Sequence, residues 1–222
     1  MSGNITPWPI LRELEAFRLA SYDQRNPVLS NLGADKRVEV GACPGLSLEW
    51  IKRHRQYPNE TPVSRMNWMR KDGVLWQAAE YTDKFNRPAS SNKERLGGDL
   101  TSHIGLNPNH HWKQAKPEAK DTSKLYLTYF NPANRYSILL ANLEGLNTDH
   151  MCATYCYEGR RGKMLVIFDP NFGEFSVPLT ASDMRRFMEA WSKQFTTYVS
   201  GRTGKAVKLT LKSVEVISLD EI

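Results

Sequence analysis

The first half of the chain carries apolar side chains at helical spacing. Apolar residues that recur every three to four positions lie on one face of a helix, so each such stretch predicts a helix. Thr6 is a suitable N-cap for the first stretch. Pro7 and Pro44 suit the first turns of their helices, because the amide that proline lacks has no helical partner there. The three predicted helices are residues 6–22, 44–54 and 66–85.

The second half of the chain predicts strands. Short runs of β-branched and aromatic residues are separated by turn formers, and one capped helix follows them, with Thr180 or Ser182 as its N-cap. The polar stretch 86–122 between the two halves is expected to be a loop. The predicted strands are residues 125–130, 136–143, 150–157, 164–168 and 174–177, with two more between 206 and 219.

This order of elements predicts an α+β fold. A helical part, about residues 1–122, precedes a mostly antiparallel sheet, about residues 123–222, without regular alternation of strand and helix. With 222 residues, 40% of them hydrophobic, the chain can bury a core and is expected to form a single domain, residues 1–222. No apolar run reaches the length of a membrane span, and no N-terminal signal peptide is recognisable.

Charge and cysteine content narrow the classes of function. The net charge of +6 comes from basic residues that are scattered along the chain, which is typical of solvated faces, and nucleic-acid binding is not expected. The three cysteines, Cys43, Cys152 and Cys156, are too few for a disulfide framework. They are expected to stay reduced in a cytosol-like compartment.

Cys43 lies where the second predicted helix begins. Gly41 permits unusual backbone angles before it, and Pro44 suits the position after it. A thiol at a helix N-terminus is close to free amides and to the positive end of the helix dipole, both of which favour the thiolate. Cys43 is therefore a candidate nucleophile, and its own amide could donate to an oxyanion. The alternative is a small, buried apolar residue.

A histidine and an aspartate lie on two strands that the sequence joins in a hairpin. A loop of residues 159–160 places His150 directly opposite Asp169, and a loop of residues 160–161 places the two one diagonal step apart. Both registers put them on one face, about 5 to 8 Å apart between β-carbons. Together with Cys43 they are a candidate triad, because a carboxylate orients a histidine that takes a thiol proton. Each is also a common structural residue.

No metal or cofactor is expected. His150, Cys152 and Cys156 alternate onto one face of a strand, but residues 150 and 156 would lie about 20 Å apart at about 3.3 Å per residue, too far for one ion. Cys152 and Cys156 are therefore interpreted as small core residues. His54 is expected to be exposed on a charged helix. No cysteine or carboxylate cluster accompanies the other histidines, His103, His110 and His111.

Three motifs in order resemble one family. Residues 41–47, GACPGLS, with Trp50 one turn on, are similar to the nucleophile segment of the YopT and AvrPphB family of bacterial effector cysteine proteases. His150 resembles the histidine of that family. Residues 168–175, FDPNFGEF, are close to its Asp-Pro-Asn-x-Gly motif.

The resemblance implies a papain-like fold, in which the helix of Cys43 packs on the sheet that carries His150 and Asp169. It implies that Cys43 is the nucleophile, His150 the base and Asp169 the residue that orients the base. It also implies an effector secreted into host cells, where relatives cleave particular host proteins such as prenylated Rho-type GTPases or plant kinases.

One position departs from the family pattern. Papain-like proteases usually place an amide side chain five or six residues before the cysteine as an oxyanion donor, and here Val38 and Arg37 occupy those positions. The candidate replacements are Asn31 and Arg37, or the backbone amides alone.

The leading hypothesis is a cysteine protease that forms an acyl-enzyme at Cys43 and acts on a host protein as a bacterial effector or toxin. A papain-fold deamidase, acyltransferase or cell-wall amidase would use the same triad, and a non-catalytic binding module is the remaining alternative. The expected partner is a protein substrate, with a small GTPase or a kinase as candidates. The chain is expected to be a monomer with at most peripheral membrane contact. The 86–122 loop and Trp112 are expected to shape the substrate groove.

Overall fold

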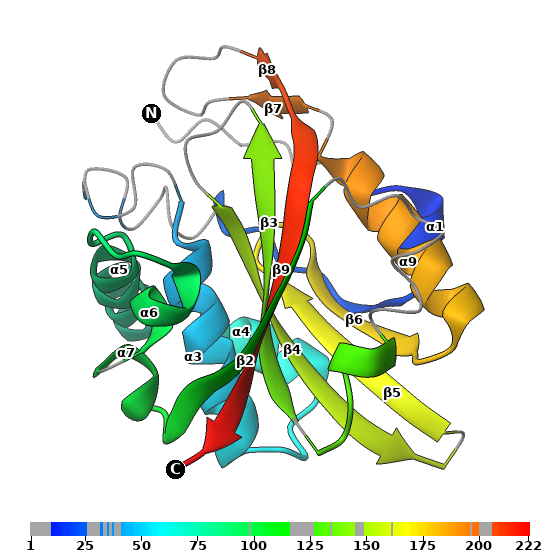
Figure 1. Cartoon of the computed structure of the whole chain (residues 1–222), viewed down its shortest axis with the longest axis horizontal. Coiled ribbons are helices and arrows are strands. Elements are labelled where there is room, and N and C mark those ends of the chain that lie inside the picture. Colours follow the sequence, from blue (N-terminus) through cyan, green and yellow to red (C-terminus); the bar gives the residue numbers. More distant parts are fainter. Residues whose placement is uncertain are drawn as a thin grey trace.

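The computed structural model shows a twisted sheet through the middle of the molecule with helices on both sides (Figure 1). The sheet forms one layer between two groups of helices. The fold is α+β. The structure describes residues 10–25, 32, 35, 37, 41–97, 99–115, 127–133, 135–144, 149–160, 162–195, 197–199 and 206–222.

The main sheet has seven strands in the order β1-β6-β5-β4-β3-β9-β2. All neighbouring strands in it are antiparallel, as the sequence predicts. A second, small sheet pairs β7 with β8. The strands are β1 (Arg18–Ala20), β2 (Leu106–Ala115), β3 (Tyr136–Glu144), β4 (Asp149–Gly159), β5 (Gly162–Asp169), β6 (Gly173–Pro178), β7 (Thr197–Val199), β8 (Ala206–Lys208) and β9 (Thr210–Glu221).

The helices form two groups, one on each face of the main sheet (Figure 1). The first group consists of α3 (Cys43–Gln56), α4 (Pro62–Met69), α5 (Asp72–Phe85), α6 (Asn92–Leu96) and α7 (Asp99–Ser102). The second group consists of α1 (Arg12–Glu15) and α9 (Ala181–Gln194).

Two hydrophobic cores lie on the two faces of the sheet. Successive side chains of a strand point to opposite faces, so Met151 of β4 joins the core under α3, whereas Cys152 joins the core under α9. Trp50 is fully buried in the first core and Trp191 in the second. Because helices cover both faces, the central strands are nearly continuous apolar runs in the sequence.

The predicted helix 6–22 is largely wrong. Residues 6–9, with the Thr6 cap and Pro7, lie outside the described residues, and the rest forms only the short helix α1 before the chain extends into β1. Strand β1 pairs with β6, and the amide of Ser176 donates to the carbonyl of Phe17 at 2.9 Å. The helical spacing of apolar residues could not reveal this pairing with a distant strand.

The other helix predictions are closer. The predicted helix 44–54 is α3, and Thr180 caps α9 by accepting a hydrogen bond from the amide of Asp183. The predicted helix 66–85 is two helices, α4 and α5, because the chain leaves helical angles at Lys71 before α5 begins.

The stretch 86–122 is not a loop throughout. Its first part forms α6 and α7, and residues 106–115 form β2, which pairs with β9 at the edge of the main sheet. The predicted strand 125–130 is also wrong, since residues 127–129 form a helical turn. The strands predicted between 136 and 177, and the two near the C-terminus, are confirmed with small shifts of their ends.

None of the described helices is both long and apolar enough to cross a bilayer.

Candidate active site

Cys43 is the first residue of α3, and packing against α5 fixes this end of the helix. Pro44 follows it without an amide hydrogen, and the amide of Gly45 donates to Oγ1 of Thr82 at 3.1 Å. A β-carbon on Gly45 would overlap the carbonyl oxygen of Ala78, so only glycine allows α3 to approach α5 this closely. The amide of Cys43 is thus left as a first-turn donor without a partner inside the helix.

The start of α3 lies along the first residues of β4. Sγ of Cys43 is 3.8 Å from the carbonyl oxygen of Asp149, and Oγ of Ser47, one turn later, donates to the carbonyl of Met151 at 3.1 Å. These two contacts bracket His150, which lies between Asp149 and Met151 on the strand. Cys43 is 7% exposed, so most of the residue is covered.

His150 and Asp169 are joined by a buried hydrogen bond. Nε2 of His150 is 2.9 Å from Oδ1 of Asp169, and both side chains are buried. The hairpin between β4 and β5 pairs Gly159 with Gly162, so the second of the two predicted registers is the observed one. Asp169 therefore lies one diagonal step from His150.

Two further donors hold the carboxylate of Asp169. Nε1 of Trp191, on α9, donates to Oδ2 at 2.7 Å, and the amide of Asn171 donates to Oδ1 at 2.8 Å. Burial raises the pKa of Asp169, but the charge and hydrogen bond of His150, together with these two donors, outweigh burial and hold the pKa below its usual value. Asp169 is thus ionised at neutral pH.

The pair also sets the protonation of His150. Burial alone lowers the pKa of His150, yet the neighbouring Asp169 carboxylate and the thiol of Cys152 hold it well above 6.5. The ring of Phe195 lies 5.2 Å from the imidazole and covers it. An imidazolium is therefore the stable form of His150 at neutral pH.

The turn after Asp169 explains the glycine of the Asp-Pro-Asn-Phe-Gly motif. Gly173 has a φ of 116°, in the left-handed region that favours glycine. A β-carbon there would also overlap the carbonyl oxygen of Ala20 on β1. This turn therefore needs glycine both for its backbone angle and for the close approach of β1.

Gln24 joins the cysteine segment to this turn, and no pattern in the sequence predicted this. Oε1 of Gln24 accepts a hydrogen bond from the amide of Ala42 at 3.0 Å, and Nε2 donates to Oδ1 of Asn171 at 2.7 Å. Its own amide donates to the carbonyl of Pro170 at 2.8 Å. Gln24 lies far outside the five- to six-residue spacing that papain-like proteases suggest, so no spacing rule could have found it.

The two oxyanion candidates from the sequence, Asn31 and Arg37, stay predictions. Asn31 lies outside the described residues. Arg37 donates through Nε and Nη2 to Asp35, and its guanidinium lies 5.4 Å from the centre of the Trp76 ring. The side chain in contact with the backbone before Cys43 is that of Gln24.

Cys152 is more than a small core residue. It is fully buried, as predicted, but its thiol contacts His150, and ligand atoms of His150, Cys152 and Asp169 all lie within 4.8 Å of one another. In the sequence, Cys156 was the third candidate beside His150 and Cys152 for a group of metal ligands. Asp169 takes that place, because the hairpin brings it opposite the start of β4.

The other histidines differ in their exposure and in their partners. The prediction that His54 is exposed is wrong: it is 5% exposed, and Nδ1 lies 2.9 Å from the hydroxyl of Tyr136. His111 pairs with Glu215 through Nε2 at 3.0 Å. Among the described residues, His103, His110 and His111 belong to no group of three or more His, Cys, Asp or Glu side chains that could hold one metal ion.

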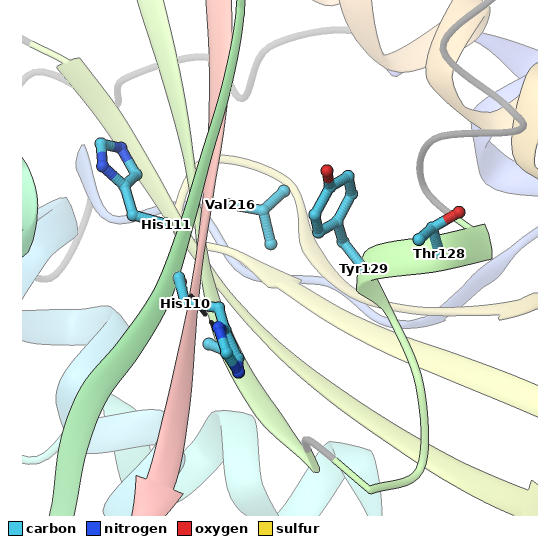
Figure 2. Close-up of a pocket in the computed structure, with 6 residues that line it drawn as sticks. His110, His111, Thr128, Tyr129 and Val216 are labelled. Carbon is cyan, nitrogen blue, oxygen red and sulfur yellow. Dashed lines mark hydrogen bonds between the residues drawn. The ribbon is translucent and has the colours of Figure 1, made fainter.

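A pocket of about 290 Å³ lies at the edge of the sheet, beside β2 and β9. Figure 2 shows His111 on the opposite side of these strands from Tyr129. Trp112 stacks on Tyr129 at 4.9 Å and packs against the core under α9, whereas Cys43 belongs to the core under α3. The expectation that residues 86–122 and Trp112 shape the substrate groove stays a prediction. The pocket is lined by His110, His111, Thr128, Tyr129, Val216 and Ser218.

An α+β fold in which a cysteine begins a helix beside a buried histidine–aspartate pair on an antiparallel sheet is that of the papain-like cysteine peptidases. The chain belongs to the Peptidase_C58 family, described as Yersinia/Haemophilus virulence surface antigen, whose model matches residues 12–216. It is therefore a cysteine peptidase, and the family resemblance of the sequence motifs is confirmed.

A solved structure supports the same fold. The crystal structure of the Pseudomonas avirulence protein AvrPphB matches with a TM-score of 0.64 and 16% sequence identity, covering 93% of this chain and 99% of that chain. At this identity the match is evidence for the fold alone. It confirms the predicted papain-like architecture. A search of curated proteins found no matching sequence.

Proposed function

We propose that Cys43, His150 and Asp169 form the catalytic triad of a protease that cleaves a host protein. The observation that carries the proposal is the buried His150–Asp169 hydrogen bond of 2.9 Å on the strand whose first residue contacts the thiol of Cys43. Nucleophile, base and orienting carboxylate occur in the order that the family motifs imply, and each is held by a different element of the fold.

In this mechanism His150 uses its two nitrogens for two tasks. Nε2 donates to Asp169, and Nδ1 holds the proton that the Cys43 thiol has released, so the resting pair is thiolate and imidazolium. The thiolate attacks the carbonyl carbon of the substrate peptide, and the imidazolium then gives its proton to the leaving amine. Water, deprotonated by the neutral imidazole, hydrolyses the acyl-enzyme and restores the thiolate.

The proposed oxyanion donors are the amide of Cys43 and Nε2 of Gln24. The Cys43 amide is a free first-turn donor of α3. One hydrogen of Gln24 Nε2 is given to Asn171, and the second is available for a substrate oxygen. Gln24 is 7% exposed and is fixed at three points, so its amide is oriented before substrate binds.

The proposed substrate is a protein, and the proposed place of action is a host cell. The carbonyl of Asp149 beside Sγ is well placed to accept a hydrogen bond from the backbone of an extended peptide. The three free cysteines suit a reducing, cytosol-like compartment reached after secretion. We propose a monomer, with a small GTPase or a kinase as the class of target and only peripheral contact with membranes.

The test compares host-type cells that express the wild type, Cys43→Ala or Cys156→Ala. Cys156 is a matched control, since it is also a buried thiol and burial raises its pKa to about 12, so it is a poor nucleophile. We expect new protein N-termini, measured by mass spectrometry, with the wild type and Cys156→Ala but not with Cys43→Ala. The purified protein should reproduce the cleavage of the best candidate.

Two outcomes would contradict the proposal. Cleavage by Cys43→Ala at the wild-type rate would exclude Cys43 as the nucleophile. A substrate that stays intact but changes mass only when Cys43 is present would show transfer or deamidation instead of proteolysis.

A further inference from the structure

Cys152 is a buried thiol that the proposed mechanism does not use. It lies on β4 two residues after His150 and contacts the imidazole, and it belongs to the core under α9. One ligand atom from each of His150, Cys152 and Asp169 can be chosen so that all three lie within 4.8 Å of one another. All three residues are buried, so this is a compact group of nitrogen, sulfur and oxygen ligands with little solvent around it.

These ligand types and distances suit zinc. Zn²⁺ binds thiolate, imidazole and carboxylate at about 2.0–2.3 Å in tetrahedral sites, which puts neighbouring ligand atoms about 3.3–3.8 Å apart. The Nε2–Oδ1 separation of 2.9 Å would widen by a few tenths of an ångström, and a thiol at the outer limit of 4.8 Å would move inward by about 1 Å. A rotation about one side-chain bond of Cys152 covers that range.

The surroundings already orient the ligands. Trp191 and the amide of Asn171 donate to the carboxylate of Asp169 at 2.7 and 2.8 Å, and Phe195 packs on the imidazole of His150. Hydrogen bonds of this kind around the ligands typically strengthen metal sites. Asp169 and Cys152 also face each other across the hairpin, where the observed β4–β5 register brings them together.

We propose that His150, Cys152 and Asp169 bind Zn²⁺ and that this binding reversibly switches the peptidase off. Starting from the imidazolium, the thiol of Cys152 and Nε2 of His150 each release one proton to solvent, and Sγ, Nε2 and Oδ1 become the three protein ligands. Three protein ligands leave a fourth position for a solvent molecule, as in sites that exchange their ligands. The loss of activity rests on the proposed function, whereas the binding itself does not.

The loss of activity follows from the nitrogen of His150 to which the metal binds. With Zn²⁺ on Nε2, the remaining proton of His150 is on Nδ1, and a ring in this state cannot accept the proton of Cys43. The metal also replaces the hydrogen bond that Nε2 of the imidazolium donates to Asp169. This site differs from a metal bridge between Cys43 and His150, because Cys43 is not one of its ligands.

Binding is measured first, on the full chain freed of metal by a chelator. The Cys43→Ala variant removes the nucleophile, and Co²⁺ is titrated in as a Zn²⁺ substitute whose thiolate charge-transfer absorption reports a sulfur ligand. We expect one equivalent of Co²⁺ to bind Cys43→Ala with this absorption and to be displaced by Zn²⁺. Adding Cys152→Ala or Cys152→Ser should weaken Zn²⁺ binding by about tenfold or more and remove the absorption. Adding the matched change Cys156→Ala should leave both unchanged.

Inhibition is measured next, relative to the metal-free activity of each protein. Zn²⁺ should inhibit the wild type and Cys156→Ala at the same concentration, chelator should restore activity, and Cys152→Ser should need about tenfold more Zn²⁺. Circular dichroism shows whether each variant is folded, and Cys152→Ser keeps the size of the side chain.

Two results would overturn the proposal. One is a Cys43→Ala protein that binds Co²⁺ without the thiolate absorption or does not bind it at all. The other is equal Zn²⁺ affinity with and without Cys152. If Co²⁺ binds Cys43→Ala as expected but no variant cleaves protein, the metal site stands and the proposed protease function fails, so the two failures are distinguishable.

Discussion

At the scale of single residues, Asp169 controls the charge of His150. Their hydrogen bond of 2.9 Å is buried, where a charge–charge interaction is screened far less than in water. The carboxylate raises the pKa of His150 against the effect of burial, and the imidazolium lowers the pKa of Asp169 in return. Each partner therefore keeps the other ionised at neutral pH.

Asp169→Asn should narrow the pH range of peptide cleavage. Without the carboxylate, burial dominates and the pKa of His150 falls, so the imidazolium that accompanies the thiolate is lost at lower pH. The alkaline limb of kcat/KM for substrate cleavage should shift to lower pH, because the imidazolium must give its proton to the leaving amine. The profile is measured with a chelator present. The change Asp83→Asn, at an exposed carboxylate, is the control and should leave the profile in place. An unchanged profile in Asp169→Asn would mean that Asp169 does not act on the base.

Gln24 gives a second prediction at this scale. Gln24→Glu keeps an oxygen that can accept from the amide of Ala42 but removes the donor that would face the oxyanion. We expect kcat to fall by about 10²–10³-fold with little change in KM, the loss typical of one oxyanion donor. Gln77→Ala, on the exposed side of α5, is the control. Wild-type kcat in Gln24→Glu would leave the oxyanion to backbone amides alone.

Some contacts of the site could be predicted from the sequence and others could not. The His150–Asp169 contact follows from a local hairpin whose two-residue loop sets the register, so it could be predicted within one step. Gln24 and Trp191 reach Asn171 and Asp169 from other parts of the chain. Only the tertiary fold brings them there, and no local pattern encodes it.

At the scale of elements, α3 carries the site and depends on a glycine. The helix was predicted from its apolar spacing and from Pro44, and these signals are local. Its close approach to α5 at Gly45 is not local, since it depends on the backbone of Ala78. The same limit explains residues 18–20, where apolar spacing predicts a helix but pairing with β6 makes a strand.

Gly45→Ala should push α3 away from α5. The added methyl group overlaps backbone, which cannot rotate aside, so we expect a loss of about 1–3 kcal/mol in the free energy of unfolding. A shift of about 1 Å at Cys43, two residues earlier, can lower kcat by about 10²-fold. Gly73→Ala is the matched control, because nothing lies within 4 Å of its added carbon, and it should stabilise by about 0.4–1 kcal/mol. Equal stability of both variants in urea would contradict this account of the contact.

At the scale of the whole molecule, the sheet separates two cores, and the site contains residues from both. Cys43 belongs to the core under α3, and Cys152, beside His150, to the core under α9. The sequence predicted an antiparallel sheet with helices before and after it, because β-branched and aromatic runs and the helical spacing of apolar residues are local signals. It did not predict which strands are neighbours, since the order β1-β6-β5-β4-β3-β9-β2 joins segments far apart in the chain.

His54 links the stability of the whole molecule to pH. It is buried in the core under α3, with its ring 5.0 Å from Trp50 and 4.4 Å from Tyr155. Burial, with a smaller contribution from the charge of Arg65, lowers its pKa to about 3. The unfolded chain takes up a proton here near its ordinary pKa of about 6.5, whereas the folded chain stays neutral until about pH 3. Protonation therefore favours the unfolded state as the pH falls through this window.

His54→Gln should reduce this acid sensitivity. One proton bound only by the unfolded state changes the free energy of unfolding by at most about 1.4 kcal/mol per pH unit, so the wild type should lose stability more steeply than the variant between pH 6 and pH 4. Urea unfolding at several pH values measures both slopes, and His103→Gln, at an exposed histidine, should keep the wild-type slope. Carboxylates such as Asp169 titrate in both proteins, so their effect cancels in the comparison. Parallel slopes for His54→Gln and the wild type would mean that His54 is protonated in the folded core. There the hydroxyl of Tyr136 lies 2.9 Å from Nδ1.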